Sequence, residues 1–391
     1  MKITSIKPIC LRYKYDQPIY DGCNTCEKRE AFLILVETDS EITGIGEAAT
    51  FGTPLSALKE VLEHSIAPLL IGEDPLKIEF LWEKLLWSNY AGGRKGLVRG
   101  VASGVDIALW DIMGKACKMP LYKLLGANSN KVQSYASAGF YSQNKSIDDL
   151  EREMESLSNY GYQAFKMKVG RTEENVSRIL RYMPKQDNLY QVEDDMKRIE
   201  AVRKVIGNSS KLMLDMNNTW NVEQVCNSVE FMKSMNIYSI EEPIQNGSTK
   251  DYQHLSNQLQ GILLAGGENE QGIEKYHHML DQDTLDIVQS NIGWSGGITE
   301  ARKIGLLCAL YNKMFSPHSF FSAVLIAANV HLSASLSNVP FIESEENENP
   351  LRSKLIKELF PRDESMAFVL TDKPGLGIDL DWEAINEYQI K

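Results

Sequence analysis

The chain has 391 residues, of which 43% are hydrophobic and 24% charged, a composition typical of a soluble globular protein with a large core. Its 41 basic residues against 53 acidic ones give a formal net charge of −12 at pH 7. This balance weighs against a nucleic-acid-binding or anionic-membrane surface, because both need clustered Lys and Arg. An acidic protein can still bind an acidic substrate, because a bound cation inverts the local field.

The N-terminus and the cysteines bear on the cellular compartment. Residues 1–14 lack the charged and apolar regions of a signal peptide. The longest apolar runs, residues 31–36 and 323–328, are far too short to span a membrane. The six cysteines are scattered along the chain. We therefore expect a cytoplasmic protein with reduced thiols.

Cys23 and Cys26 form a CxxC pair within a polar turn region, residues 20–29. A zinc site would need a second such pair or nearby histidines, and the sequence supplies neither. A thioredoxin-like pair would follow a strand and open a helix, whereas this pair precedes a strand. We interpret the two cysteines as an incidental pair in a loop, in preference to a redox or metal function.

The N-terminal part of the chain predicts a module of strands followed by helices. Hydrophobic patterning predicts three strands and then three helices, over residues 3–13, 31–38, 44–47, 54–70, 75–87 and 98–117. We place this α+β domain at residues 1–126, and we expect a tail of about residues 370–391 to return to it.

From residue 127 to about residue 369 the sequence alternates short apolar strands with amphipathic helices. Eight strands are predicted, over residues 132–140, 164–170, 212–217, 237–243, 262–268, 285–291, 314–318 and 341–343. Alternating β and α units give a parallel sheet, and eight of them suit closure into a barrel. An open doubly wound sheet is the alternative, but the sequence lacks the glycine-rich phosphate turn that such a sheet would need. The predicted fold class is therefore α/β, with a TIM-like barrel at residues 127–369.

Catalytic groups of a parallel barrel lie at the C-terminal ends of its strands. Polar or ionisable residues stand at the predicted ends of seven successive strands: Lys166 with Lys168, Asp215, Glu241, Glu268, Asn291, His318 and Glu343.

Three of these residues, Asp215, Glu241 and Glu268, are carboxylates separated by one βα unit each, so they should lie side by side. Uncompensated anions at that spacing repel one another, and a hard dication such as Mg²⁺ with oxygen ligands relieves the repulsion. The alternative is that each carboxylate caps the helix that follows it. Three consecutive strands with the same feature favour the metal site.

Lys166 and Lys168 share one face of their strand, and the apolar residues around them indicate that this face is inward. Two adjacent ammonium groups should lower each other's pKa, which makes Lys168, nearer the strand end, a credible base. The alternative is a surface strand edged with lysines, which fits the flanking apolar residues poorly. His318, across the predicted rim, is a second acid–base candidate, although a lone His is more often a packing or capping residue.

The ordered set of motifs resembles the mandelate racemase-like branch of the enolase superfamily over nearly the whole chain. The matching motifs are Lys166-Met167-Lys168, Asp215-Met216-Asn217, Ile240-Glu241-Glu242-Pro243, Gly267-Glu268-Asn269, Ser295-Gly296-Gly297-Ile298-Thr299, Pro374-Gly375-Leu376-Gly377 and the Val105–Asp111 helix with Gly114-Lys115. The resemblance implies a (β/α)₇β barrel under an α+β capping domain.

The resemblance also implies roles for individual residues. Asp215, Glu241 and Glu268 would bind one Mg²⁺, and the metal would chelate the carboxylate of a small-molecule substrate. Lys168 would act on one face of the α-carbon, tuned by Lys166, and His318 would act on the opposite face. The expected substrate-side residues are Asn217, Glu343, Tyr20 and Tyr90, with Arg94 nearby. Relatives of this kind are usually symmetric assemblies, so a homo-oligomer is expected.

Three departures from the family pattern matter. Asn291 stands where the family has an Asp that supports the histidine, and a neutral amide orients the ring without stabilising an imidazolium. Ser290 replaces the sixth-strand lysine of the muconate-cycloisomerase and dipeptide-epimerase branches. These changes weaken a two-base racemase and favour one-base chemistry from Lys168. The stretch 171–211 is also longer than usual, which predicts an extra helical segment, with a helix at residues 192–206.

Residues 342–352 resemble the corresponding stretch of acid-sugar enzymes such as galactarolactone cycloisomerase. Dehydration and lactone opening are both β-eliminations from one enediolate, so an acid-sugar dehydratase or cycloisomerase is the favoured function. A racemase, an epimerase or a muconate-type cycloisomerase is the alternative within catalysis. A barrel that binds metal without turnover is the alternative outside it.

Overall fold

The computed structural model describes residues 1–92, 94–175, 192–245 and 248–390. Its N-terminal part is an antiparallel sheet of order β3-β2-β1-β6. The bounds of these strands are β1 (Ile3–Tyr20), β2 (Thr25–Thr38), β3 (Thr43–Ala48) and β6 (Tyr141–Ser142). Helices follow in the order α1 (Leu55–Val61), a π-helical turn η1 (Leu62–Ile66), α2 (Ala67–Leu70), α3 (Ile78–Ser88) and α4 (Leu97–Ala116).

Strand β3 packs unusually closely on helix α4. A Cβ atom at Gly44 would overlap the carbonyl oxygen of Ala108, and one at Gly46 would overlap that of Gly104. Glycine is therefore required at both strand positions, because any side chain would separate the sheet from the helix.

The second sheet has eight strands, in the order β12-β11-β10-β9-β8-β7-β5-β13, all paired in parallel. Their bounds are β5 (Ser134–Ala138), β7 (Ala164–Lys168), β8 (Lys211–Asp215), β9 (Ile237–Glu241), β10 (Leu263–Gly266), β11 (Ile287–Val288), β12 (Met314–Phe315) and β13 (Ile342–Glu345). The two outer strands approach each other, because the Ser316 hydroxyl donates to the Phe341 carbonyl over 2.8 Å. The curled eight-stranded sheet confirms the predicted barrel.

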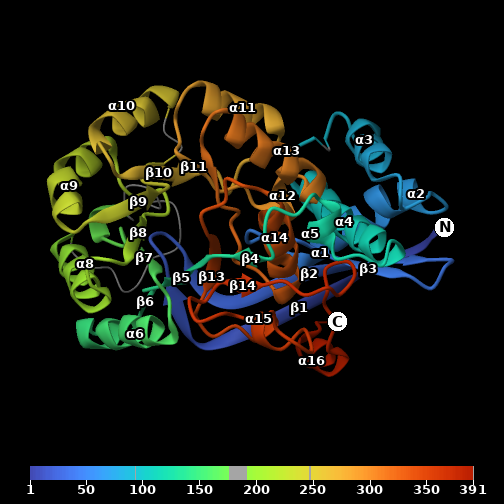
Figure 1. Cartoon of the computed structure of the whole chain (residues 1–391), viewed down its shortest axis with the longest axis horizontal. Helices are drawn as coiled ribbons and strands as arrows, with labels where there is room; N and C mark the ends of the chain where they lie inside the picture. Colours follow the sequence, from blue (N-terminus) through green and yellow to red (C-terminus); the bar gives the residue numbers. More distant parts are fainter. Residues whose placement is uncertain (93, 176–191, 246–247, 391) are drawn as a thin grey trace.

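Helices lie outside the curled sheet, as Figure 1 shows. In chain order they are α6 (Ile147–Tyr160), α8 (Val192–Ile206), α9 (Val222–Ser234), α10 (Thr249–Leu259), α11 (Ile273–Asp281), α12 (Ile292–Ser295), α13 (Gly297–Leu310) and α14 (Ala323–Ser335). Three of them begin at reciprocal capping boxes, with N-caps Ser146, Asn221 and Ser248. The helix predicted at residues 192–206 is present, whereas residues 176–191 lie outside the described part of the chain.

The β1–β2 hairpin is longer than predicted. The sequence predicted strands only at residues 3–13 and 31–38, but pairing continues to Ile19 with Cys26 and Tyr20 with Thr25. The polar end of the hairpin is held by β6, which follows barrel strand β5 and pairs with Ile19 and Tyr20. Tertiary pairing thus extends strands whose sequence lacks the alternation of a half-buried strand.

The C-terminal segment after the barrel contains α15 (Pro350–Ser353), β14 (Phe368–Val369) and α16 (Trp382–Tyr388), and β14 pairs with β4 (Lys131–Val132). It returns to the N-terminal sheet, where the Ile390 amide donates to the Cys10 carbonyl over 2.9 Å. It also reaches the short helix α5 (Leu121–Leu124), because the Leu121 amide donates to the Gly375 carbonyl. No described helix combines the length and the hydropathy that crossing a bilayer requires.

Candidate active site

The register of the parallel strands places the catalytic candidates at the same rim of the barrel. Lys168 ends β7, Asp215 ends β8 and Glu241 ends β9, and the three are successive Cα partners in the parallel ladder. Glu268 follows β10, and His318 follows β12. Parallel strands that end at one rim therefore bring together residues far apart in sequence, as the spacing predicted.

Two buried lysines and three buried carboxylates form an ionic cluster at this rim. The Lys166 ammonium lies 2.9 Å from Glu241 and 2.9 Å from Glu343. Lys168 contacts Asp215 directly, and its ammonium lies 5.1 Å from the centre of the Phe140 ring. The prediction that both lysines face inward is confirmed, since Lys166 is 1% and Lys168 5% exposed.

The predicted lowering of the lysine pKa values is wrong for this arrangement. Burial does lower the pKa of Lys168, but the surrounding carboxylates, of which Asp215 is the strongest, together outweigh burial and raise the pKa above its ordinary value. For Lys166, Glu241 and Glu343 similarly outweigh burial, and the pKa is raised. An opposite charge in contact is stronger than the repulsion between the two ammonium groups.

Two carboxylates near this rim have pKa values raised by burial and by neighbouring carboxylates. Burial, followed by the Asp215 charge, raises the pKa of Glu241 to about 8. Glu242, which the sequence analysis did not single out, also has a raised pKa, through burial and the neighbouring Glu268. Mutual repulsion of this kind indicates an anionic site that a cation would stabilise.

Asp215, Glu241 and Glu268 are the candidate ligands of a divalent metal ion. Across the described residues, no three His, Cys, Asp or Glu side chains already stand in a metal-binding arrangement. Asp215 and Glu241 instead face the lysine ammonium groups. The chemistry of the three carboxylates nevertheless fits, because hard oxygen donors are what Mg²⁺ prefers in proteins.

His318 is oriented by Asn291, whose side-chain amide forms hydrogen bonds through both its oxygen and its NH₂ group. The Asn291 oxygen accepts from the Gly293 amide over 2.9 Å, so its NH₂ group faces His318 Nδ1, 2.8 Å away. Nδ1 must therefore accept, and the ring proton is left on Nε2. Nε2 lies 3.2 Å from a Glu268 oxygen. Asn291 thus fixes the tautomer, which an Asp at the same position would reverse.

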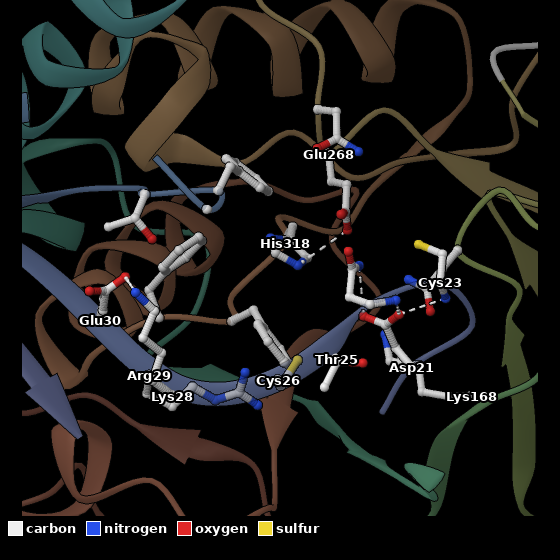
Figure 2. A pocket seen from close by; sticks show the side chains of 18 of the residues that line it. Asp21, Cys23, Thr25, Cys26, Lys28, Arg29, Glu30, Lys168, Glu268 and His318 are labelled. Carbon is white, nitrogen blue, oxygen red and sulfur yellow. Dashed lines mark hydrogen bonds and ion pairs between the residues drawn. The ribbon is translucent and has the colours of Figure 1, made fainter. Parts of the chain in front are cut away.

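A cavity of about 500 Å³ opens above this rim. From the barrel it is lined by Lys168, Asn217, Asn218, Glu242, Glu268, Asn269, His318, Phe320 and Phe321. The N-terminal module lines it with residues 21 and 23–30 of the β1–β2 hairpin and with residues 50–52. Figure 2 shows Lys168, His318 and Glu268 around the same space as Asp21, Cys26 and Arg29 of the hairpin.

The predicted substrate-side residues lie in different places. Asn217 lines the cavity, and its oxygen accepts from the Gly22 amide over 3.2 Å. Tyr20 does not line it, because the ring is buried under the Arg171 guanidinium, 4.5 Å away. Tyr90 is 59% exposed and stacks on Trp87 outside the cavity.

Glu343 and Arg94 also lie away from the cavity lining. Glu343 is fully buried between Lys166 and His318, with its oxygens 2.9 Å and 3.7 Å from these residues. Burial raises the pKa of Glu343, but the neighbouring cations, of which Lys166 is the strongest, outweigh burial and lower it. Glu343 is thus placed to orient the two other side chains. Arg94 pairs with Glu274 on the surface.

The contribution of the hairpin to the cavity was not predicted from the sequence. Its tip is tethered by Arg171, whose Nη1 donates to the carbonyls of Asp21 and Asn24 over 3.1 and 3.0 Å. Cys23 and Cys26, interpreted above as an incidental pair, are free thiols in the cavity lining. Burial raises the pKa of both, that of Cys26 to about 11, so the thiol form is favoured. The sequence signal for this contribution is that residues 21–30 are polar although they belong to a pair of strands.

Two family models match most of the chain. The model described as the mandelate racemase / muconate lactonizing enzyme N-terminal domain matches residues 5–126. The model described as enolase C-terminal domain-like matches residues 149–384.

Two named relatives cover most or all of the chain. An arabinonate dehydratase of Saccharolobus solfataricus is 33% identical over 359 residues, which is 91% of this chain and 90% of the relative. A D-galactarolactone cycloisomerase of Agrobacterium fabrum is 29% identical over 402 residues, covering 100% and 99%.

Solved structures share the fold. The 3,6-anhydro-D-galactonate cycloisomerase of Zobellia galactanivorans superposes with a TM-score of 0.86 at 28% identity, covering 100% of both chains. A racemase of Streptomyces coelicolor A3(2), solved with bound magnesium, has a TM-score of 0.86 at 24% identity, covering 99% of this chain and 100% of the other.

Proposed function

The chain belongs to the mandelate racemase / muconate lactonizing enzyme family of the enolase superfamily and is an enzyme, and from this premise we propose that it removes the α-proton of an acid sugar or its lactone. The resulting enediolate then undergoes β-elimination, by dehydration or by lactone opening. The observation that carries the proposal is that Lys168, His318 and Glu268 line one cavity beside further buried carboxylates.

The proposal assigns one Mg²⁺ ion to Asp215, Glu241 and Glu268. When bound, the ion supplies positive charge to the substrate carboxylate, where negative charge develops as the α-proton leaves. Asp215 and Glu241 are fully buried, and of the three ligands only Glu268 lines the cavity. Lys166, between Glu241 and Glu343, offsets part of the negative charge of this group.

Lys168 is the proposed base. Its ammonium group reaches the cavity from β7. It also contacts Asp215, so its protonation depends on the charge of the carboxylate cluster. The neutral form needed to accept the α-proton is favoured when the charge of Asp215 is shared with another cation.

His318 is the proposed hydrogen-bond donor to the leaving group. With Nδ1 occupied by Asn291, the Nε2 proton is the one that the ring offers toward the cavity. A ring held in this tautomer donates and does not accept at Nε2. This asymmetry supports elimination over racemisation, because a racemase needs a base on each face of the α-carbon.

We assign different roles to two domains of the chain. Residues 127–369 carry the metal ligands and acid–base groups, and residues 1–126 with about 370–391 close the cavity. The hairpin and residues 50–52 are the parts of the N-terminal module that line it.

The function is tested by product analysis on a panel of acid sugars and their lactones. Purified enzyme with Mg²⁺ is followed by proton NMR, and a 2-keto-3-deoxy acid or an opened lactone is expected for at least one member. The same reaction with excess EDTA should stop, and added Mg²⁺ should restore it. An inverted α-carbon without elimination would replace this function by racemisation, and no reaction across the panel would overturn it.

A further inference from the structure

The end of the cavity away from the carboxylate cluster contains a buried cation, Arg29. The side chain comes from the β1–β2 hairpin, lines the cavity and is 7% exposed. Its guanidinium lies 4.1 Å from the centre of the Phe320 ring, and the Lys168 ammonium lies 5.8 Å from the centre of the same ring. The two cations are thus close enough for one sugar-acid chain to reach both.

Arg29 retains unused hydrogen-bonding capacity. Its Nη2 donates to a Glu345 oxygen over 3.1 Å, but within the described chain its Nε has no hydrogen-bond partner. The hydroxyl of Tyr15, whose ring centre is 5.4 Å from the guanidinium, is likewise buried and unpartnered among the described residues. Buried donors of this kind cost free energy unless a ligand or water satisfies them.

The charges around Arg29 are not balanced by its protein partner. Glu345 is fully buried and is shared with Arg352, whose Nη1 lies 2.8 Å away, so two guanidinium groups face one carboxylate. Glu30, also in the cavity lining, is shared by Lys28 and Arg12 in the same manner. Glu27, on the same hairpin, is exposed to solvent. Arg29 is therefore only partly neutralised by Glu345, which it shares with a second guanidinium group, and it lies opposite the anionic end at Glu268.

We propose that the Arg29 guanidinium binds a second carboxylate of the substrate, so that the enzyme prefers a dicarboxylic acid sugar over the monocarboxylic acid of the same configuration. The inference rests on the proposed function and narrows its substrate class. A desolvated guanidinium that still has a free donor binds a carboxylate more strongly than it binds a hydroxyl. Arg29 is accordingly a specificity-determining residue and takes no part in proton transfer.

The test compares matched substrates. Steady-state kcat and KM are measured for aldarates and for the aldonates of the same configuration, with the natural enzyme and with Arg29→Met and Arg29→Lys. The natural enzyme should prefer the dicarboxylate. Arg29→Met should raise KM for the dicarboxylate about a hundredfold, the loss typical of truncating one partner of a buried charge pair, with little change in kcat. For the monocarboxylate, KM should stay within about threefold, and Arg29→Lys should give an intermediate KM.

Arg12→Met is the matched control, because it removes a cation that pairs with Glu30 but does not line the cavity. It should leave the ratio between the two substrates unchanged. Equal losses for both substrates in Arg29→Met, or turnover of aldonates alone by the natural enzyme, would overturn the inference and leave the proposed function standing. Turnover of neither substrate class would overturn the proposed function itself.

Discussion

The pairing of Asn291 with His318 shows how one atom changes what a site can do. Substituting an amide for a carboxylate leaves the hydrogen-bond distance ordinary, at 2.8 Å, but reverses the donor and the acceptor. The Gly293 amide fixes the orientation of Asn291, because it donates to the oxygen at the start of α12. The tautomer of the histidine therefore follows from a helix cap.

The tautomer can be measured by ¹⁵N NMR at a pH where imidazole is neutral. In the natural enzyme, His318 should carry its proton on Nε2, and Asn291→Asp should move it to Nδ1, because a carboxylate only accepts. His331 serves as an internal reference, since its Nδ1 accepts from the Tyr122 amide and its Nε2 donates to the Leu376 carbonyl. A proton on Nδ1 of His318 in the natural enzyme would contradict the assignment.

At the scale of elements, the β1–β2 hairpin is positioned by the barrel. Arg171, fully buried after β7, donates to carbonyls at the hairpin tip, and Asn217 after β8 accepts from it. The hairpin carries Arg29, so the tether also positions Arg29 in the cavity lining.

Arg171→Met should loosen the hairpin tip. We expect faster amide hydrogen exchange over residues 21–25 and a KM raised about tenfold, because the charged donor to both tip carbonyls is lost. Arg203→Met is the matched control: Arg203 is also buried and donates to the carbonyls of Met235 and Asn236, away from the cavity. Unchanged exchange at the tip in Arg171→Met, or an equal effect in the control, would rule out the tether.

Helix α14 is joined to α5 and to the C-terminal tail through His331. Burial lowers its pKa to about 4 from 6.5. As the pH falls through this interval, the unfolded chain takes up the proton before the folded chain does, so stability decreases. The loss attributable to His331 is about 3 kcal/mol between pH 6.5 and pH 4.

The loss is measured by urea unfolding across this pH range, with His331→Gln compared with the natural chain. Buried Glu47 and Asp106, each with a pKa raised to about 7, act in the opposite direction, so the difference between the two proteins is the quantity to follow. It should shrink as the pH falls. Exposed His278→Gln should track the natural chain. A difference independent of pH would exclude His331 as the cause.

Across the whole molecule, the sequence predicted the features that depend on strand alternation and on the regular spacing of βα units. Strand alternation placed Lys166 and Lys168 on one inward face, and the βα spacing placed Asp215 and Glu241 on adjacent strands. The position of Glu268 at the same rim follows from the same rule.

What the sequence could not predict depends on contacts between distant segments. Arg29 and Glu345 are 316 positions apart in the chain, and no local sequence pattern predicts that they pair. The lysine pKa directions were wrong for the same reason, since the carboxylates in contact belong to other strands. Tyr20 and Tyr90 were predicted from their place in the N-terminal module, which says little about where the backbone directs their side chains.

Deuterium exchange at the α-carbon shows whether Lys168 takes the α-proton in a Mg²⁺-dependent step. The acid-sugar panel is incubated in D₂O with Mg²⁺, and deuterium at the α-carbon of substrate and product is followed by NMR for the natural enzyme, Lys168→Ala and the surface control Lys204→Ala. The natural enzyme and the control should exchange, whereas Lys168→Ala should lose at least about a thousandfold in rate. Calorimetry should show that Lys168→Ala still binds Mg²⁺. Exchange that persists in Lys168→Ala would mean that another group removes the α-proton.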